Sequence, residues 1–155
     1  MIEYEKKYLV KELPEDLELY QKSEIMQGYL SNNPDMRIRQ YKQENDEMFY
    51  VLTIKVKNGL YRDETEFQIN QEQFNNLVPL VQSKWIEKTR YYIPLADLLE
   101  AELDIYYDEL SGLQTVEVEF LNEVEANEFI PPVWFGEDVT FDKKYKNASL
   151  AFGGL

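Results

Sequence analysis

Charged residues recur at every second position in nearly all of the strand-like segments of this chain. Seven such sets occur: Glu3/Glu5/Lys7, Arg37/Arg39, Lys55/Lys57, Arg62/Glu64/Glu66, Lys88/Arg90, Glu102/Asp104 and Glu117/Glu119. Because successive side chains of a strand point to opposite faces, each set lies on one face of its strand. The intervening residues are often apolar, such as Met36 and Ile38. The pattern predicts strands with one face in a hydrophobic core and the other densely charged.

The segments that carry these sets are rich in Tyr, Val, Ile, Thr and Phe, which is typical of β-strands. We expect eight strands, at residues 2–10, 25–30, 36–42, 48–57, 61–69, 86–93, 101–107 and 115–121. Asn58-Gly59 predicts a hairpin turn between two of them, because both residues tolerate positive φ.

Helices are expected in the gaps between the strands. The expected starts are Leu13-Pro14, Asn70 (with an interruption near Pro79) and Asn122, and a short last helix is expected around residues 147–150. No linker or repeat divides the 155 residues, so residues 1–155 are expected to form a single domain. The element order predicts an α+β fold, an antiparallel sheet or barrel with helices packed outside.

Composition limits the chemistry and the partners. The chain has no Cys and no His, so a metal would be held by oxygen and acid–base chemistry would run without imidazole. A net charge of −14 argues against nucleic-acid and anionic-membrane binding. No apolar run approaches the ~18 residues of a membrane helix, and the first residues are charged rather than signal-like, so a cytoplasmic location is expected.

All four arginines of this acidic chain fall in strand-like segments, at positions 37, 39, 62 and 90. One interpretation is an ordinary sheet face exposed to water. The seven charged sets, which are spread over nearly all of the expected strands, favour a second interpretation. In it the strands close into a barrel, and the charges in its interior must pair or bind ions. Carboxylates suit Mg²⁺ or Mn²⁺, and Arg and Lys suit phosphate oxygens, so both signs together indicate a metal–polyphosphate site. Because no GxxxxGK[ST] loop is present, side chains would hold the phosphates.

An ordered series of motifs resembles the CYTH superfamily, also called triphosphate tunnel metalloenzymes. The series spans roughly residues 2–151 and comprises Glu3-x-Glu5-x-Lys7, Gln27-Gly28-Tyr29-Leu30, Arg37-x-Arg39, Leu52-Thr53-Ile54-Lys55, Arg62-x-Glu64-x-Glu66, Lys88-x-Arg90, Glu102-x-Asp104, Gly112-Leu113 before Glu117-x-Glu119, and Val139-Thr140-x-Asp142-x-Lys144-Tyr145-x-Asn147. The resemblance implies an eight-stranded antiparallel β-barrel, a tunnel whose charged lumen binds a triphosphate and a divalent metal, Mg²⁺ or Mn²⁺.

The resemblance also implies roles for individual residues. The metal ligands would be Glu3, Glu5, Glu117 and Glu119, with Asp104 a further candidate; the first four and Lys7 form the catalytic set. The triphosphate would be bound by Lys7, Arg37, Arg39, Lys55, Arg62, Lys88 and Arg90, with Lys144 standing where many relatives have Arg. Glu64 and Glu66 would hold these basic side chains or a second metal, and Glu102 would be a further supporting residue. Lys57 has no counterpart in the family motifs and is assigned to a solvated or rim position, and Trp85 and Trp134 are assigned to packing.

Hydrolysis of a triphosphate is the favoured function, with tripolyphosphate or a broad range of triphosphates as substrate. A class IV adenylate cyclase, which makes cyclic AMP and pyrophosphate from ATP, and a thiamine triphosphatase stay as alternatives. A barrel that only binds polyphosphate or nucleotide is the non-enzymatic alternative, against which the acidic set argues. A barrel that carries a lipid would need an apolar lumen, and the charged sets at every second position argue against it. A homodimer is an open alternative to a monomer.

Overall fold

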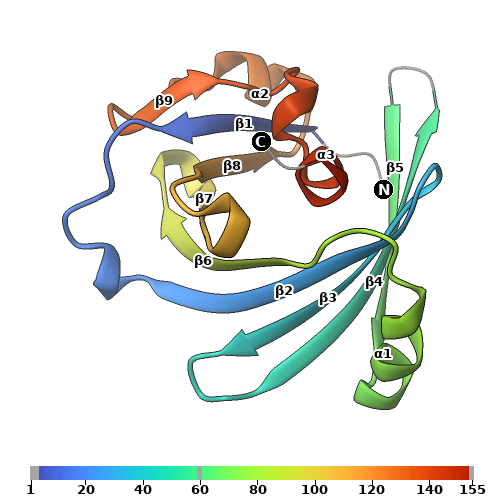
Figure 1. Cartoon of the computed structure of the whole chain (residues 1–155). Coiled ribbons are helices and arrows are strands. Elements are labelled where there is room, and N and C mark those ends of the chain that lie inside the picture. Colours follow the sequence, from blue (N-terminus) through green and yellow to red (C-terminus); the bar gives the residue numbers. More distant parts are fainter. Residues whose placement is uncertain (1–3, 59–60, 154–155) are drawn as a thin grey trace.

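The computed structural model describes residues 4–58 and 61–153, apart from the side chains of residues 57, 58, 61 and 62 (Figure 1). Within this part of the chain, nine strands form one antiparallel sheet with the order β5-β4-β3-β2-β6-β7-β8-β1-β9. The strands are β1 Tyr4–Val10, β2 Gln21–Asn32, β3 Asp35–Gln43, β4 Met48–Asn58, β5 Tyr61–Ile69, β6 Ile86–Pro94, β7 Glu100–Tyr106, β8 Gln114–Phe120 and β9 Phe135–Asp138.

All eight predicted strands are present, and β9 is an additional short strand that the sequence did not predict. β4 and β5 pair as far as Asn58 opposite Tyr61, in agreement with the predicted hairpin. Residue 59 of the predicted Asn58-Gly59 turn lies outside the described residues.

The prediction of a closed eight-stranded barrel is wrong for this structure. The sheet order ends at β5 and at β9, and within residues 4–58 and 61–153 no ladder joins these two ends. β9 pairs with β1 at Tyr8 and Val10 and so occupies an edge that closure would need. Figure 1 shows the result, a strongly curved but open sheet that passes from β9 and β1 through β6 and β2 to β5.

Two hydrophobic clusters cover the convex face of this sheet. The first cluster includes Leu103, Val116 and Val118, and α2 Glu123–Glu128 packs on it. The second includes Ile38, Tyr50 and Phe74, the last from α1 Gln71–Leu77. As predicted, Asn70 caps α1 in a capping box and Asn122 caps α2 by accepting a hydrogen bond from the Glu125 N–H. Trp85 and Trp134 pack against these clusters, as predicted.

The last helix, α3 Asn147–Phe152, lies on the other face, so the prediction that helices pack outside is wrong for α3. Leu150 is buried with Tyr29 and Tyr106, whose side chains share a sheet face with Arg37 and Lys88 respectively. Figure 1 shows α3 within the curve of the sheet. We call this face, which carries the charged sets, the inner face.

The helix predicted from Leu13 is reduced to a single 3₁₀ turn, Leu17–Leu19, because extended backbone resumes at Tyr20. Among the described residues, no helix has the length and apolarity needed to cross a membrane.

Candidate functional site: the charged inner face

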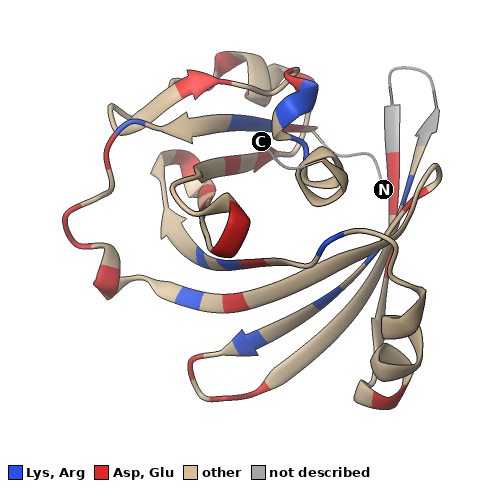
Figure 2. Cartoon of the chain, in the orientation of Figure 1, with Lys and Arg blue, Asp and Glu red and all other residues tan. Residues whose placement is uncertain are grey.

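The register of the sheet gathers the charged sets on the inner face. Lys7 lies opposite Glu117 and Glu5 opposite Glu119 in the β1–β8 ladder. Arg90 lies opposite Asp104 in the β6–β7 ladder. Figure 2 shows acidic and basic segments interspersed along the curving strands, so neither sign is confined to one half of the sheet.

Asp104 forms the most buried ion-pair cluster of the inner face. Its carboxylate accepts two hydrogen bonds from Arg90, at 2.8 Å from Nε and 2.9 Å from Nη2. Lys88 Nζ lies 2.8 Å from Asp104 Oδ2, and Arg90 Nη1 lies 2.8 Å from Glu102 Oε2. Such two-pronged arginine–carboxylate contacts are strong and orient the guanidinium. The arrangement holds two cations in fixed positions on β6.

Burial and pairing shift the pKa values in this cluster in opposite directions. Burial alone would raise the pKa of Asp104, but the positive charges of Arg90 and Lys88 outweigh it and hold that pKa well below its usual range. Burial lowers the pKa of Lys88 to about 8, against the attraction of Asp104.

A second cationic group stands on β3 and β4. Arg39 Nη2 donates to Glu66 Oε1 at 2.9 Å and to Thr53 Oγ1 at 3.1 Å. Its guanidinium carbon lies 5.3 Å from the centre of the Tyr41 ring. Arg37 is also buried, and Lys55 Nζ lies 3.7 Å from Glu64 Oε2. Arg39 and Lys55 are therefore held against carboxylates of the edge strand β5.

An acidic group lies on β1 and β8. Burial, followed by the nearby Glu117 carboxylate, raises the pKa of Glu5 to about 7. The pKa of Glu119 is also raised, by burial and then by the carboxylates of Glu102, Glu64 and Glu117. Lys7 Nζ lies 3.4 Å from Glu117 Oε1 and donates a hydrogen bond to the Tyr145 carbonyl oxygen.

The chemistry of this acidic group fits a hard divalent cation. Glu5, Glu117 and Glu119 offer carboxylate oxygens, the donors that Mg²⁺ and Mn²⁺ prefer. The pKa of Glu5 is raised first by burial and then by the Glu117 carboxylate, and a bound cation would offset both effects by stabilising the charged form. Within the described residues, no three acidic side chains are already gathered closely enough to hold a metal ion.

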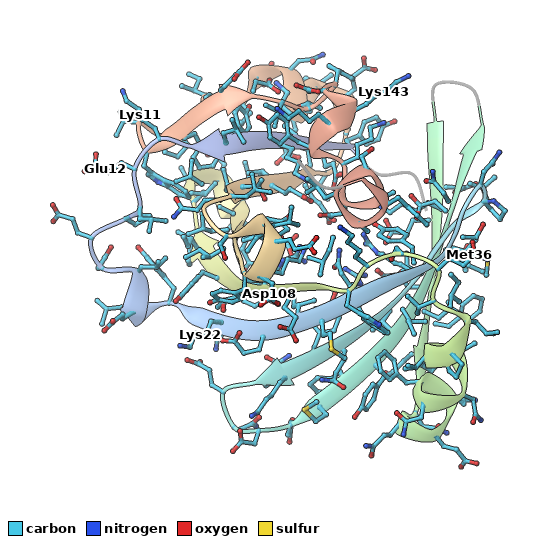
Figure 3. All side chains as sticks on the ribbon, in the orientation of Figure 1. Lys11, Glu12, Lys22, Met36, Asp108 and Lys143 are labelled. Atoms are coloured by element: carbon cyan, nitrogen blue, oxygen red, sulfur yellow. The ribbon has the colours of Figure 1, made fainter. Side chains whose placement is uncertain are left out.

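Several predicted site residues lie outside the described residues or have other neighbours. Glu3 and the side chain of Arg62 lie outside the described residues, as does the side chain of Lys57. Both oxygens of Asp104 contact Lys88 or Arg90, and its predicted part in metal binding stays a prediction. Lys144 is exposed, with Nζ 5.3 Å from the centre of the Tyr145 ring. Figure 3 shows the neighbouring Lys143 at the periphery of the molecule.

The structure adds residues that sequence reasoning did not assign. Thr53 and Tyr41 both contact the Arg39 guanidinium, and the Tyr145 carbonyl contacts Lys7. The two side chains could have been found by continuing the every-second-residue count, from Arg39 to Tyr41 and from Lys55 back to Thr53. The carbonyl contact joins residues 138 positions apart and has no sequence signal.

A cavity of about 510 Å³ adjoins Arg39. Its walls include Tyr41, Phe49, Tyr92 and Glu66. Arg39 is thus a buried cation that borders open space on the inner face.

Comparison with known proteins places this geometry in a family. No family model matches the chain. An inorganic triphosphatase from Nitrosomonas europaea is 46% identical over 151 residues, which cover 97% of each sequence. The crystal structure of an inorganic triphosphatase superposes with a TM-score of 0.69 at 41% identity, over 96% of this chain and 93% of that one.

Two more distant structures share the fold alone. A protein from Pyrococcus horikoshii has a TM-score of 0.57 at 20% identity, over 81% of this chain and 82% of that one. A Hippeastrum protein, proposed as an adenylyl cyclase and described as having a dominant triphosphatase activity, has a TM-score of 0.55 at 14% identity, over 82% and 83%. By its identity to the Nitrosomonas protein over nearly the full length of both, the chain belongs to the inorganic triphosphatase family of the CYTH superfamily.

Proposed function

We propose that this protein hydrolyses inorganic triphosphate to phosphate and diphosphate with the help of a divalent cation. The observation that carries the proposal is the inner face itself. Three glutamates of β1 and β8 share this face with six cations from four strands. The cations are Lys7, Arg37, Arg39, Lys55, Lys88 and Arg90. A face that carries both signs suits a polyanion together with its metal. The 46% identity to an inorganic triphosphatase supports this substrate.

In the free protein, carboxylates act as counterions for the cations that would bind the triphosphate. Arg39 pairs with Glu66, which is half-exposed, and Lys55 pairs with Glu64. A triphosphate would take the place of such carboxylates at the guanidinium and ammonium groups. Arg90 and Lys88 would keep Asp104 as a fixed partner, because that carboxylate is buried with them. The site is therefore preorganised on β6 and adjustable beside β5.

The metal would be held by the acidic group of β1 and β8. We propose Glu5, Glu117 and Glu119 as ligands of Mg²⁺ or Mn²⁺, with Glu3 as a further ligand and Lys144 as a further triphosphate contact. When bound, such an ion neutralises charge on the phosphoryl group and its leaving group. Asp104 is left to position the cations.

The reaction needs little covalent chemistry from the protein. A water molecule attacks the terminal phosphorus, the bond from that phosphorus to the bridging oxygen breaks, and a proton is released as phosphate and diphosphate form. The buried cations hold the chain of phosphates in line and spread its negative charge. Because the chain has no His, a carboxylate of the inner face would take the proton.

Steady-state product analysis tests the proposal. Tripolyphosphate, ATP and thiamine triphosphate are supplied with Mg²⁺ or Mn²⁺, and phosphate, diphosphate and cyclic AMP are measured. Phosphate and diphosphate from tripolyphosphate in equal amounts are expected. The rate at substrate concentrations below KM should fall in Arg39→Ala and be retained in Lys84→Ala, whose ammonium is exposed and pairs with Glu109. Cyclic AMP from ATP without tripolyphosphate hydrolysis would replace the proposal with the cyclase alternative.

A further inference from the structure

Gln27 occupies the centre of the cationic part of the inner face. It lies on β2, where it is opposite Arg39 of β3 and opposite Ile86 of β6. Arg37 and Lys88 are each one inner-face position away along those neighbouring strands. The side chain of Gln27 is 0% exposed. A buried neutral amide thus lies opposite one cation, Arg39, and diagonal to two others, Arg37 and Lys88.

The amide of Gln27 has no hydrogen-bond partner among the described residues, on either its oxygen Oε1 or its nitrogen Nε2. The Nε atoms of Arg37 and Arg39 are likewise buried without a hydrogen-bond partner in that part of the chain. These atoms belong to residues that neighbour one another across β2 and β3. Three adjacent side chains therefore present unused donors to the same part of the inner face.

Such an arrangement is costly in a folded protein. Buried polar groups almost always find a partner, and an unsatisfied amide loses its hydration without compensation. Gln27 does not hold the arginines in place, because Arg39 is bound by Glu66 and Thr53 instead. The unused groups are mainly donors beside positive charge, a combination that an anion oxygen satisfies.

We propose that Gln27 contacts the substrate: its Nε2 donates a hydrogen bond to an oxygen of the phosphate group that Arg37 and Arg39 bind. This inference rests on the proposed function and names a residue of that same site. An amide supplies the donor without adding a fourth positive charge beside Arg37, Arg39 and Lys88, which would repel one another in the free protein. The cost of the unpaired amide in the free protein is recovered when the triphosphate binds.

The variant Gln27→Met tests the inference, because methionine keeps the length of the side chain and removes both amide groups. Tripolyphosphate binding is measured by calorimetry with EDTA present, and KM and kcat are measured with Mg²⁺. We expect affinity to fall about tenfold or more, as for a lost hydrogen bond to a charged group. We expect KM to rise, and the melting temperature of the free protein to stay unchanged or to increase.

Thr89→Val is the matched control. Thr89 is buried on the convex face of β6 and donates a hydrogen bond to Glu24 at 2.8 Å. This variant should melt at a lower temperature and bind tripolyphosphate like the wild type. A second readout uses the wild-type protein labelled with ¹⁵N, in which the side-chain amide signals of Gln27 should shift as tripolyphosphate is added.

Two results would overturn the role of Gln27. A lower melting temperature or failure to fold in Gln27→Met, with unshifted amide signals in the wild type, would mean that the amide is satisfied within the free protein. Wild-type affinity in Gln27→Met would mean that no contact with the substrate exists. If the wild type itself neither bound nor hydrolysed tripolyphosphate, the proposed function would fall and the role of Gln27 with it.

Discussion

Lys88 Nζ lies 2.8 Å from Asp104 Oδ2, and each side chain is only 1% exposed. The same carboxylate receives the two-pronged contact of Arg90. Asp104 is thus the shared counterion of two buried cations, and Arg90 also pairs with Glu102 at 2.8 Å. These contacts fix the positions in which Lys88 and Arg90 would meet a polyanionic substrate.

Replacing Asp104 should therefore destabilise the protein strongly. In Asp104→Asn, Lys88 and Arg90 lose their shared counterion while staying buried, so the free energy of unfolding should fall by about 3–5 kcal/mol. Urea unfolding at pH 7.5 measures the change. Glu109→Gln is the control, because its pair with Lys84 is exposed and should contribute less than ~1 kcal/mol. Equal effects of the two substitutions would contradict the ion-pair cluster.

Lys88 should produce a characteristic pH dependence of stability. Its pKa is about 8 in the folded protein, against an ordinary value of 10.5. Between these pH values the unfolded chain binds more protons, so the free energy of unfolding rises with pH. Relative to Lys88→Met, the wild type should gain on the order of 1–3 kcal/mol from pH 7.5 to 10.5. Parallel stability curves for the two proteins would show that Lys88 keeps an ordinary pKa.

Arg39 should be needed for its geometry as well as for its charge. Arg39→Ala removes a two-pronged phosphate donor, so KM for tripolyphosphate should rise by about tenfold to a hundredfold. Arg39→Lys should recover only part of this loss, since an ammonium cannot make the planar contact. Full recovery by lysine would mean that only the charge matters at this position.

Glu119 should matter through the metal. Glu119→Gln keeps the shape of the side chain and removes one of three carboxylates on β1 and β8, so affinity for Mn²⁺ should fall at least tenfold. Turnover at limiting Mn²⁺ should fall with it and be partly restored at high Mn²⁺, while the melting temperature is retained. Glu109→Gln serves as the surface control. Unchanged Mn²⁺ affinity in the folded Glu119→Gln variant would remove this residue from the ligand set.

The predictable part of the fold was local. Charged and apolar residues alternate in Met36-Arg37-Ile38-Arg39, and this period of two assigns each side chain to one face of its strand. The register of β3 places Arg37 and Arg39 on the same face, as predicted. The pairing of Arg90 with Asp104 was not predicted, because it depends on the register between β6 and β7. The start of the helix after Asn70 was also predictable, because its cap depends only on Asn70 and Gln73, which are three positions apart.

The unpredicted part depends on contacts between distant segments. Phe135 in β9 pairs with β1. The four residues of β9 are too few to show the alternating pattern that predicts a strand. Leu150 of α3 reaches Tyr29 on the inner face, which short-range periodicity does not indicate. The open edge at β5 reflects that β9 already lies beside β1. The unpaired amide of Gln27 appears only once its neighbours on two other strands are in place.

We propose that the inner face binds a triphosphate and a divalent cation together. The decisive experiment is a crystal structure with Mn²⁺ and a non-hydrolysable imido analogue of tripolyphosphate, in which anomalous scattering locates the manganese. We expect manganese at Glu5, Glu117 and Glu119, and phosphate groups against Arg37, Arg39, Lys88 and Arg90. Manganese or the analogue bound only on the convex face, with Arg39 still paired to Glu66, would contradict it.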